Sequence, residues 1–460
     1  MRFFRKRCFR QLIPYITVVL VTYVIWAAAR WRWADYNLSL KSLSHNSGSR
    51  IASTVSTPDR PNDFSINSDV AKLAYHKKWV GFPELSRVDC VAALSKSVKN
   101  SMFSQLVTRT PALKYVSDSS DCPSFRKIYG FDRYPKVSRE ELDFPIAFII
   151  LFNKDFDQVA FLLRAIYRSH NLYCLNVDSK TDQNLIQGAY ALARCLPNVF
   201  VASRLERIVY AGFSRLQADI ICMGDLLKHP VKWRYVINMP GQQFPLRTNL
   251  EMVKILQHYN GTNDIEGITG HRMLPNRFLY KHAYDINPET GEKMIKTTSE
   301  KLKGPPHGFV VVKGSAYGTF SRPFVAFVLM DRRAKDLLKW CESVKSPDEY
   351  FWATLHHSKT VPVPGAYTAG KPDNKPWLTV YASWGGVDSC ATIRRRSVCI
   401  FSPEDLPGLL TRREIFANKF YITHYPTALH CLDQMLYNLT VRRHTREINY
   451  YKHFPFIKNA

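Results

Sequence analysis

The sequence predicts an α/β fold built on a doubly wound, parallel sheet. The first observation is a continuous apolar run at residues 145–152, which is typical of a strand buried on both faces. The second is the regular alternation of short apolar segments with amphipathic segments from residue 144 onward. Strands that alternate with helices at this spacing indicate βαβ units, in which consecutive strands run parallel.

The predicted elements follow one another along the chain. After the strand at 145–152, residues 157–169 form a helix, because Val159, Leu162, Leu163 and Ile166 lie on one helical face. Further strands are predicted at residues 172–177, 198–202 and 233–239, with helices at 182–195 and 214–227. Asp178 directly follows the second strand, and such sheets bind ligands beyond the carboxyl ends of their strands.

Three common motifs are absent from the sequence. No Gly-x-Gly-x-x-Gly follows the first strand, which disfavours a Rossmann dinucleotide site. Neither a Walker phosphate-binding loop nor a Gly-x-Ser-x-Gly elbow occurs in the sequence.

The N-terminal residues predict a membrane anchor. A basic tail, residues 1–10, precedes an uncharged apolar stretch at residues 11–29. Positive charge before such a stretch favours a cytoplasmic N-terminus, so the rest of the chain is expected on the lumenal side. A cleaved signal peptide is the alternative, because Ala27, Ala28 and Ala29 suit a cleavage site, but the apolar run exceeds a typical signal core.

Three segments are expected after the anchor. Residues 30–68 are rich in Ser, Asn, Arg and Thr and are expected to form a flexible stem. Residues 69–143 have a mixed pattern and are expected to form a helical cap. Residues 144–460 are expected to form the main lumenal domain.

The composition indicates a large core and a basic surface. The chain has 460 residues, of which 46% are hydrophobic, and a formal net charge of +26. No helix-turn-helix, RNA-binding or zinc-finger pattern accompanies this charge, so nucleic acid is not an expected partner. A basic lumenal surface suits a phosphate-bearing ligand, acidic glycans or membranes; an ordinary solvated basic surface is the alternative.

The cysteines and sequons fit a secretory-pathway protein. Nine of the ten cysteines follow the predicted anchor, where an oxidising compartment favours disulfides with one thiol left over. A zinc site is the competing interpretation, and the irregular spacing without a Cys-x-x-Cys pair disfavours it. Asn37, Asn260 and Asn438 each begin an N-glycosylation sequon.

Two adjacent carboxylates mark the candidate catalytic stretch, residues 345–354. Ser346 suits the N-cap and Pro347 the first position of a helix. Asp348 and Glu349 then fall in the first turn, where the helix dipole favours anions. The stretch is therefore either an ordinary acidic helix start or the place where a general base is presented to a cleft.

A series of motifs, in order along the chain, resembles one family. The chain is similar over residues 122–431 to the core 2 type β1,6-N-acetylglucosaminyltransferases, which form glycosyltransferase family 14. The motifs are Tyr173-Cys-Leu-Asn-Val-Asp178, Asn198-Val-Phe-Val-Ala-Ser-Arg-Leu-Glu206, Val209-Tyr-Ala211, Ser214-Arg-Leu-Gln-Ala-Asp219, Phe244-Pro-Leu-Arg-Thr-Asn249, Gly314-Ser-Ala-Tyr317, Ser346-Pro-Asp-Glu-Tyr350, Arg396-Ser-Val-Cys399 and Phe416-Ala-Asn-Lys419.

The resemblance implies a Golgi type II membrane enzyme with a glycosyltransferase-A fold and a mixed, doubly wound sheet. It implies inverting transfer from a UDP-sugar, with GlcNAc as the family's usual donor, to the 6-hydroxyl of GalNAc in Galβ1,3GalNAc on Ser or Thr. No metal or other cofactor is implied. The family pattern makes Glu349 the catalytic base, since the attacking hydroxyl must lose a proton to a nearby carboxylate. Asp348 is expected to shape the helix start.

The resemblance also places the groups that bind UDP. Fixed cations can neutralise the leaving diphosphate in place of a metal, and the family pattern puts them at Arg396 and Lys419. Leu151, Asp178 and Tyr210 match the uridine side.

The sequence offers no metal motif where this fold would carry one. The fourth strand runs into residues 238–243 without a carboxylate. Asp155-Phe-Asp157 is a literal Asp-x-Asp, but it follows the first strand and opens a helix, so Asp157 is expected to be a cap.

Acceptor positions are implied with some departures from the family. Glu266 and Arg277 keep the spacing of residues that bind the GalNAc hydroxyls, while a lysine that the family has between them falls at Leu274. The aromatic pair expected before Cys390 is Trp377 and Tyr381, or involves Trp384, and would pack on a sugar face. The family's aspartate in the turn after the fourth strand is Gln243 here.

The resemblance implies a disulfide scheme. Four pairs are expected, and the thiol left over is Cys341, which follows apolar helix residues and is expected to be buried and inert; a reactive thiol near Glu349 is the alternative. The implied pairs are Cys122–Cys195, Cys174–Cys222, Cys390–Cys399 and Cys90–Cys431.

Other functions remain to be weighed against a transferase. One alternative class is a glycan-binding membrane protein or a matrix-interaction protein on an inactive transferase fold. Glu349, Arg396 and Lys419 together argue against it, since binding alone needs no base. Closer rivals use the same fold with UDP-glucose or UDP-xylose, as the related peptide xylosyltransferases do; the Tyr-Cys-x-x-Val-Asp and Arg-Ser-Val-Cys contexts favour the core 2 type.

Overall fold

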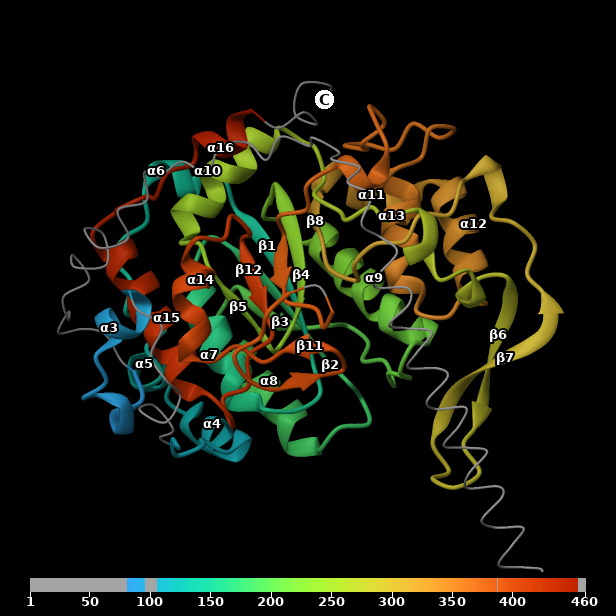
Figure 1. Cartoon of the computed structure of the whole chain (residues 1–460). Coiled ribbons are helices and arrows are strands. Elements are labelled where there is room, and N and C mark those ends of the chain that lie inside the picture. Colours follow the sequence, from blue (N-terminus) through green and yellow to red (C-terminus); the bar gives the residue numbers. More distant parts are fainter. Residues whose placement is uncertain (1–80, 96–105, 387, 454–460) are drawn as a thin grey trace, which may run out of the picture. The chain divides into compact units, whose positions relative to one another are not determined.

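A computed structural model describes residues 81–95, 106–386 and 388–453 (Figure 1). The predicted tail, anchor and stem, together with Asn37, lie outside these residues. None of the helices in the described ranges is long and apolar enough to span a membrane.

The central sheet has five strands in the order β3–β2–β1–β4–β8. Its parallel part consists of β1 (Ile146–Phe152), β2 (Leu172–Val177), β3 (Val199–Val201) and β4 (Tyr235–Pro240). β8 (Thr319–Ser321) pairs antiparallel with β4. The predicted α/β class with a parallel core is therefore confirmed, and the added strand makes the sheet mixed, as in the glycosyltransferase-A type.

Helices cover both faces of this sheet. Successive side chains of a strand point to opposite faces, so each strand contributes to a core on either side. Even-numbered residues of β1, from Ile146 to Phe152, belong to one core with α7 (Phe156–Ile166), α8 (Gln183–Cys195) and α10 (Asn249–Tyr259). Odd-numbered residues, from Ala147 to Leu151, belong to a second core with α9 (Phe213–Lys228), α11 (Arg322–Met330) and α12 (Arg332–Cys341). Figure 1 shows the strands between α7 and α8 on one side and α9 on the other.

Smaller elements complete the part of the chain after the sheet. A second sheet has the order β5–β12–β9, and two hairpins are formed by β6 with β7 and by β10 with β11. The bounds are β5 (Gln243–Pro245), β6 (Tyr280–Ile286), β7 (Lys293–Lys301), β9 (Val380–Ala382), β10 (Arg394–Arg395), β11 (Val398–Cys399), β12 (Phe416–Asn418), α13 (Phe351–His356), α14 (Leu406–Leu410), α15 (Pro426–Val441) and α16 (Asn449–Lys452).

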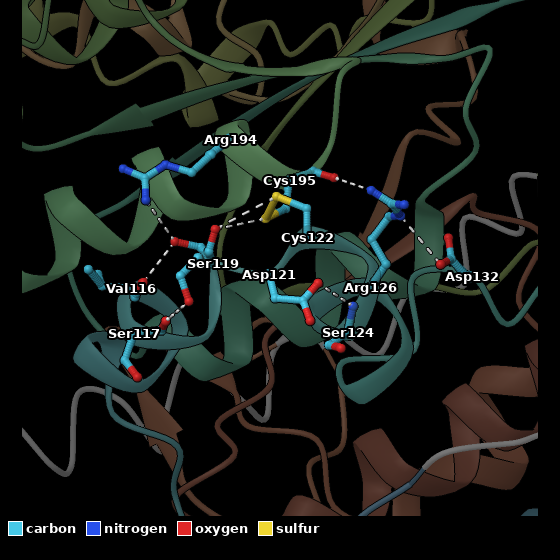
Figure 2. Close-up of a disulfide and its surroundings, with 11 residues drawn as sticks. Val116, Ser117, Ser119, Asp121, Cys122, Ser124, Arg126, Asp132, Arg194 and Cys195 are labelled. Carbon is cyan, nitrogen blue, oxygen red and sulfur yellow. Dashed lines mark hydrogen bonds and ion pairs between the residues drawn. A yellow bond between two sulfur atoms is a disulfide. The ribbon is translucent and has the colours of Figure 1, made fainter.

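The described part of the predicted cap consists of short helices joined to the main domain by disulfides. These helices are α3 (Cys90–Ser95), α4 (Ala112–Asp118), α5 (Cys122–Ile128) and α6 (Arg139–Leu142). Figure 2 shows Cys122 bonded to Cys195 at the end of α8, with Arg126 donating to the Cys195 carbonyl at 3.3 Å and Arg194 donating to the Ser119 hydroxyl at 3.3 Å.

The structure contains the four disulfides that the resemblance implies: Cys90–Cys431, Cys122–Cys195, Cys174–Cys222 and Cys390–Cys399. Cys341 is a free, buried thiol, and burial raises its pKa. A thiol that stays protonated is a poor nucleophile, so Cys341 fits the expected buried, inert thiol and not the reactive alternative.

The two sequons in the described residues differ in accessibility. Asn260 is exposed at the C-terminal cap of α10, in the left-handed conformation with φ 43°. Asn438 is only 1% exposed within α15. Of the two sequons in the described residues, Asn260 is therefore the one whose side chain is accessible in the folded protein.

A buried ion cluster joins the cap to α7 and to α15. Asp433, fully buried in α15, accepts hydrogen bonds from Arg133 at 2.6 and 2.7 Å and from Arg164 of α7 at 2.9 Å. Both arginine side chains are almost completely buried. Asp433 thus supplies the negative charge that pairs with both buried guanidinium groups.

We expect Asp433→Asn to lower the free energy of unfolding by about 3–5 kcal/mol, because two buried guanidinium groups lose their counter-charge. Asp143→Asn is the matched control, since the Arg139–Asp143 pair is largely exposed and should contribute little. Denaturant unfolding with intact disulfides measures both variants. Equal stabilities for the two would contradict the importance given to this cluster.

Candidate active site

A cleft of about 690 Å³ opens at the carboxyl ends of the parallel strands. Leu151 and Phe152 line it from the end of β1, Asn176 and Asp178 from the end of β2, and Pro240 from the end of β4. This is the edge at which doubly wound sheets bind ligands, and Asp178 lies at this edge as the sequence indicates.

All but one of the residues predicted for catalysis, donor binding and acceptor binding line this single cleft. Tyr381 is the exception. The residues brought together are Leu151, Asp178, Tyr210, Glu266, Arg277, Glu349, Trp377, Arg396 and Lys419.

Glu349 lies at the end of a 3-10 turn, η6 (Pro347–Glu349), and α13 begins at Phe351. Pro347 occupies the first position of the turn, as predicted. Ser346 precedes it in the left-handed conformation, with φ 53°, and its side chain makes no capping hydrogen bond, so the predicted side-chain cap is wrong. Instead the main chain is fixed, because Glu349 N–H donates to Ser346 O at 3.0 Å and Gly314 N–H donates to Glu349 O at 2.6 Å.

The Glu349 carboxylate is held by two cations. Arg277 Nη1 lies 2.7 Å and Lys313 Nζ 3.1 Å from the same atom, Oε2. The Glu349 side chain remains 28% exposed to the cleft. Charge-assisted hydrogen bonds of this length fix the orientation of a carboxylate, and a fixed carboxylate in a cleft can accept a proton from a bound hydroxyl.

Asp348 is the more deeply buried of the two adjacent carboxylates. Its Oδ2 lies 4.0 Å from Nε of Arg215 in α9, and Arg215 also pairs with Asp219 at 2.6 Å. Burial raises the pKa of Asp348 to about 6, while the charge of Arg215 opposes the rise. Asp348 therefore links the turn to α9, and its side chain is less exposed to the cleft than that of Glu349.

A second group of charges, Arg396, Lys419 and Lys180, also lines the cleft. Arg396 lies at the tip of the β10–β11 hairpin, where it and Ser397 both have positive φ angles of 52° and 63°. Its guanidinium carbon lies 4.3 Å from the ring centroid of Tyr210. Burial lowers the pKa of Lys419, and the nearby positive charge of Arg396 lowers it further. We call these three residues the cation group.

Asp178 shapes the wall beside the cation group. Its Oδ1 accepts hydrogen bonds from the main-chain N–H groups of Lys180 and Ile208, each at 3.1 Å. The second bond anchors the loop that carries Tyr210, whose ring is 71% exposed. The carboxylate thus orders the loop from which the aromatic side chain reaches the cleft.

Glu266 and Lys313 extend the group of charges around Glu349. Burial raises the pKa of Glu266, and the positive charges of Lys313 and Arg272 oppose this rise. Glu349, Arg277, Lys313 and Glu266 are called the base group below. Its two carboxylates and two cations can exchange several hydrogen bonds with a hydroxyl-rich ligand.

Tyr381 does not reach the cleft. It is the central residue of β9, and its neighbours Val380 and Ala382 line the cleft while Tyr381 points to the opposite face. There it stacks on Phe401, with 5.7 Å between ring centroids, and lies 3.7 Å below the Arg412 guanidinium. The aromatic pair that lines the cleft consists of Trp377 and the alternative residue, Trp384.

The Asp155-Phe-Asp157 sequence lies at the start of α7 and does not line the cleft. Asp155 occupies the position before α7 but makes no side-chain capping bond, and Asp157 lies inside the first turn. Arg109 binds both carboxylates. The predicted capping role of Asp157 is therefore wrong. In the described ranges, His, Cys, Asp and Glu side chains form no group of three able to hold a metal ion.

Lys313 and Lys180 are cleft cations that the sequence analysis missed. Lys313 immediately precedes the Gly314-Ser-Ala-Tyr317 motif, and Lys180 lies two residues after Asp178. Their closeness to these motifs could have indicated them. A single lysine in a chain with 64 Lys and Arg residues does not stand out by itself.

Comparison with known proteins identifies the family. The sequence model described as "Core-2/I-Branching enzyme" matches residues 146–410. An N-acetyllactosaminide β-1,6-N-acetylglucosaminyl-transferase of Mus musculus is 39% identical over 310 residues, covering 67% of this chain and 76% of that protein.

Two further relatives have names of the same reaction class. The Mus musculus β-1,3-galactosyl-O-glycosyl-glycoprotein β-1,6-N-acetylglucosaminyltransferase 4 is 38% identical over 328 residues, or 70% of this chain and 71% of that protein. A Homo sapiens β-1,3-galactosyl-O-glycosyl-glycoprotein β-1,6-N-acetylglucosaminyltransferase is 34% identical over 382 residues, or 78% and 87%. The resemblance seen in the sequence is confirmed: this chain belongs to the Core-2/I-branching enzyme family and is a glycosyltransferase.

Proposed function

We propose that this protein is an inverting, metal-independent β1,6-glycosyltransferase that uses a UDP-sugar, with GlcNAc as the favoured donor. The proposed acceptor is the 6-hydroxyl of GalNAc in Galβ1,3GalNAc on Ser or Thr. The observation that carries the proposal is that one cleft contains both a cation-held carboxylate, Glu349, and the separate cation group. The names of the relatives support the β1,6 linkage and the donor.

The proposed reaction is a single displacement. The acceptor oxygen forms a bond to C1 of the donor sugar while its proton passes to Glu349. The bond between C1 and the β-phosphate oxygen breaks, and UDP leaves with the electron pair. Because attack and departure take place on opposite faces of C1, an α-linked donor gives a β-linked product.

The cation group is proposed to stabilise the departing diphosphate. Arg396 and Lys419 supply fixed positive charge where negative charge develops, which is the role that a divalent cation has in other transferases. Asp178, Leu151 and Tyr210 are proposed to bind the uridine, since they line the same cleft as the cation group.

The acceptor is proposed to bind at the base group. Glu266 and Arg277 offer an acceptor and donors for sugar hydroxyls, and Trp377 with Trp384 offers aromatic faces for C–H groups. A second acceptor, N-acetyllactosamine, is favoured by the relative that is 39% identical, whose name specifies it. UDP-glucose and UDP-xylose are the donor alternatives, and an inactive glycan-binding protein is the alternative from another class.

The proposed location is the Golgi membrane, with a single anchor at residues 11–29 and a lumenal catalytic domain. The supporting observations are the basic tail before the apolar stretch and the four disulfides, which require an oxidising compartment.

We expect Glu349→Gln to lose most transfer activity while it still binds UDP, because the amide cannot accept the proton. The expected loss in kcat is about 10²–10⁴-fold, the range of a general base. Glu342→Gln, at an exposed glutamate that pairs with Lys339, is the matched control. Transfer assays and calorimetric UDP titration measure the two effects; near-normal turnover of the Glu349 variant would remove it from the base role.

We expect EDTA to leave the rate of transfer unchanged. We also expect Arg396→Ala and Lys419→Ala to weaken UDP binding. Each substitution should raise the Kd about 10- to 100-fold, because a hydrogen bond to a charged group is lost. Arg395→Ala is the matched control, because this exposed neighbour in the same hairpin does not line the cleft. Activity that is lost to chelation and restored by Mn²⁺ would contradict the metal-independent mechanism.

A further inference from the structure

Lys313 is a cleft cation to which the proposed mechanism gives no separate role. Its Nζ lies 3.1 Å from Glu349 Oε2, and its side chain is only 14% exposed. Burial raises the pKa of Glu266, and the positive charge of Lys313 is the largest influence that opposes this rise. One ammonium group therefore acts on both carboxylates of the base group.

The main chain around Lys313 is fixed on both sides. Lys313 N–H donates to Ile268 O at 3.2 Å, and Ile268 N–H donates to Lys313 O at 2.7 Å. The next residue, Gly314, donates to the carbonyl of Glu349 at 2.6 Å. Lys313 is thus held between the segment that carries Glu266 and the turn that carries Glu349.

Gly314 allows this close approach. A Cβ at this position would lie 2.4 Å from the carbonyl oxygen of Glu266 and 3.0 Å from the Cβ of Ala353 in α13. Backbone packed this closely leaves Lys313 little freedom to move along the cleft. The ammonium position therefore follows from main-chain contacts and not only from its own side-chain torsions.

Lys313 and Arg277 contact the same carboxylate oxygen from different parts of the chain. Arg277 ends η4 (Pro275–Arg277), whereas Lys313 lies before β8. With both cations on Oε2, the other oxygen, Oε1, is the one that an acceptor hydroxyl can use.

We propose that Lys313 is a positioning residue for the transfer reaction. Its ammonium group holds Glu349 Oε2 together with Arg277 and leaves Oε1 to take the proton of the acceptor hydroxyl. The inference rests on the proposed role of Glu349 as the base. It adds that Glu349 is an efficient base only when both Arg277 and Lys313 hold its carboxylate.

The test compares Lys313→Met, Lys313→Gln and Lys313→Arg in the full chain, with Lys296→Met as the matched control. Lys296 is 68% exposed and pairs with Asp285, away from the cleft lining. For each variant, kcat and the KM values for UDP-sugar and for acceptor are measured. Circular dichroism verifies the fold.

We expect the Met and Gln variants to lose about 10- to 100-fold in kcat, the scale of a misplaced catalytic group, with an unchanged KM for UDP-sugar. Lys313→Arg, which keeps the positive charge, should recover most of the lost kcat. A residue with a purely structural role would show neither this rescue nor a fall in kcat at an unchanged KM for UDP-sugar.

Two results would overturn the inference while leaving the proposed function intact. One is a wild-type kcat in the Met and Gln variants, with Glu349→Gln still inactive. The other is a raised KM for acceptor with kcat unchanged, which would make Lys313 an acceptor-binding residue. An active Glu349→Gln would instead refute the proposed base itself, so the two failures are distinguishable.

Discussion

The position of the Glu349 carboxylate depends on contacts among segments that are far apart in the sequence. Its main chain is bonded to Ser346 and Gly314, and its side chain to Arg277 and Lys313. A glutamate on a single turn would have several side-chain rotamers of similar energy. Here two charge-assisted contacts restrict it, and the central sheet determines where the contributing segments meet.

The cleft separates its charges into two groups with different chemistry. In the base group, carboxylates and cations are mixed, which suits a neutral, hydroxyl-rich sugar. The cation group lies beside the carboxylate of Asp178, whose Oδ1 accepts two main-chain N–H groups and whose Oδ2 lies 3.9 Å from Lys180 Nζ. Such an arrangement suits a diphosphate that gains negative charge as it leaves.

The periodic parts of the fold were predictable from the sequence alone. The strand at 145–152 and the helices between later strands leave clear apolar patterns, because each is buried on a defined face. The edge of the sheet at which the cleft opens followed from the parallel strand order. The residues of the cleft, by contrast, were found through the order of short motifs, which no periodicity would have revealed.

The errors in prediction concern side chains whose direction depends on tertiary contacts. Tyr381 and Trp384 are both aromatic residues near Cys390, and only the register of β9 decides that Tyr381 faces Arg412. Asp157 resembles a cap until Arg109, distant in the sequence, is seen to bind it.

The most direct measurement of the central claim is the structure of the product. The full chain is incubated with UDP-GlcNAc and a Galβ1,3GalNAc-aryl acceptor in the presence of EDTA, and the new linkage is determined by NMR. The account predicts a single product with GlcNAc β-linked to O6 of GalNAc. An α-linked product, attachment to another hydroxyl, or no transfer from UDP-GlcNAc, UDP-glucose or UDP-xylose would contradict it.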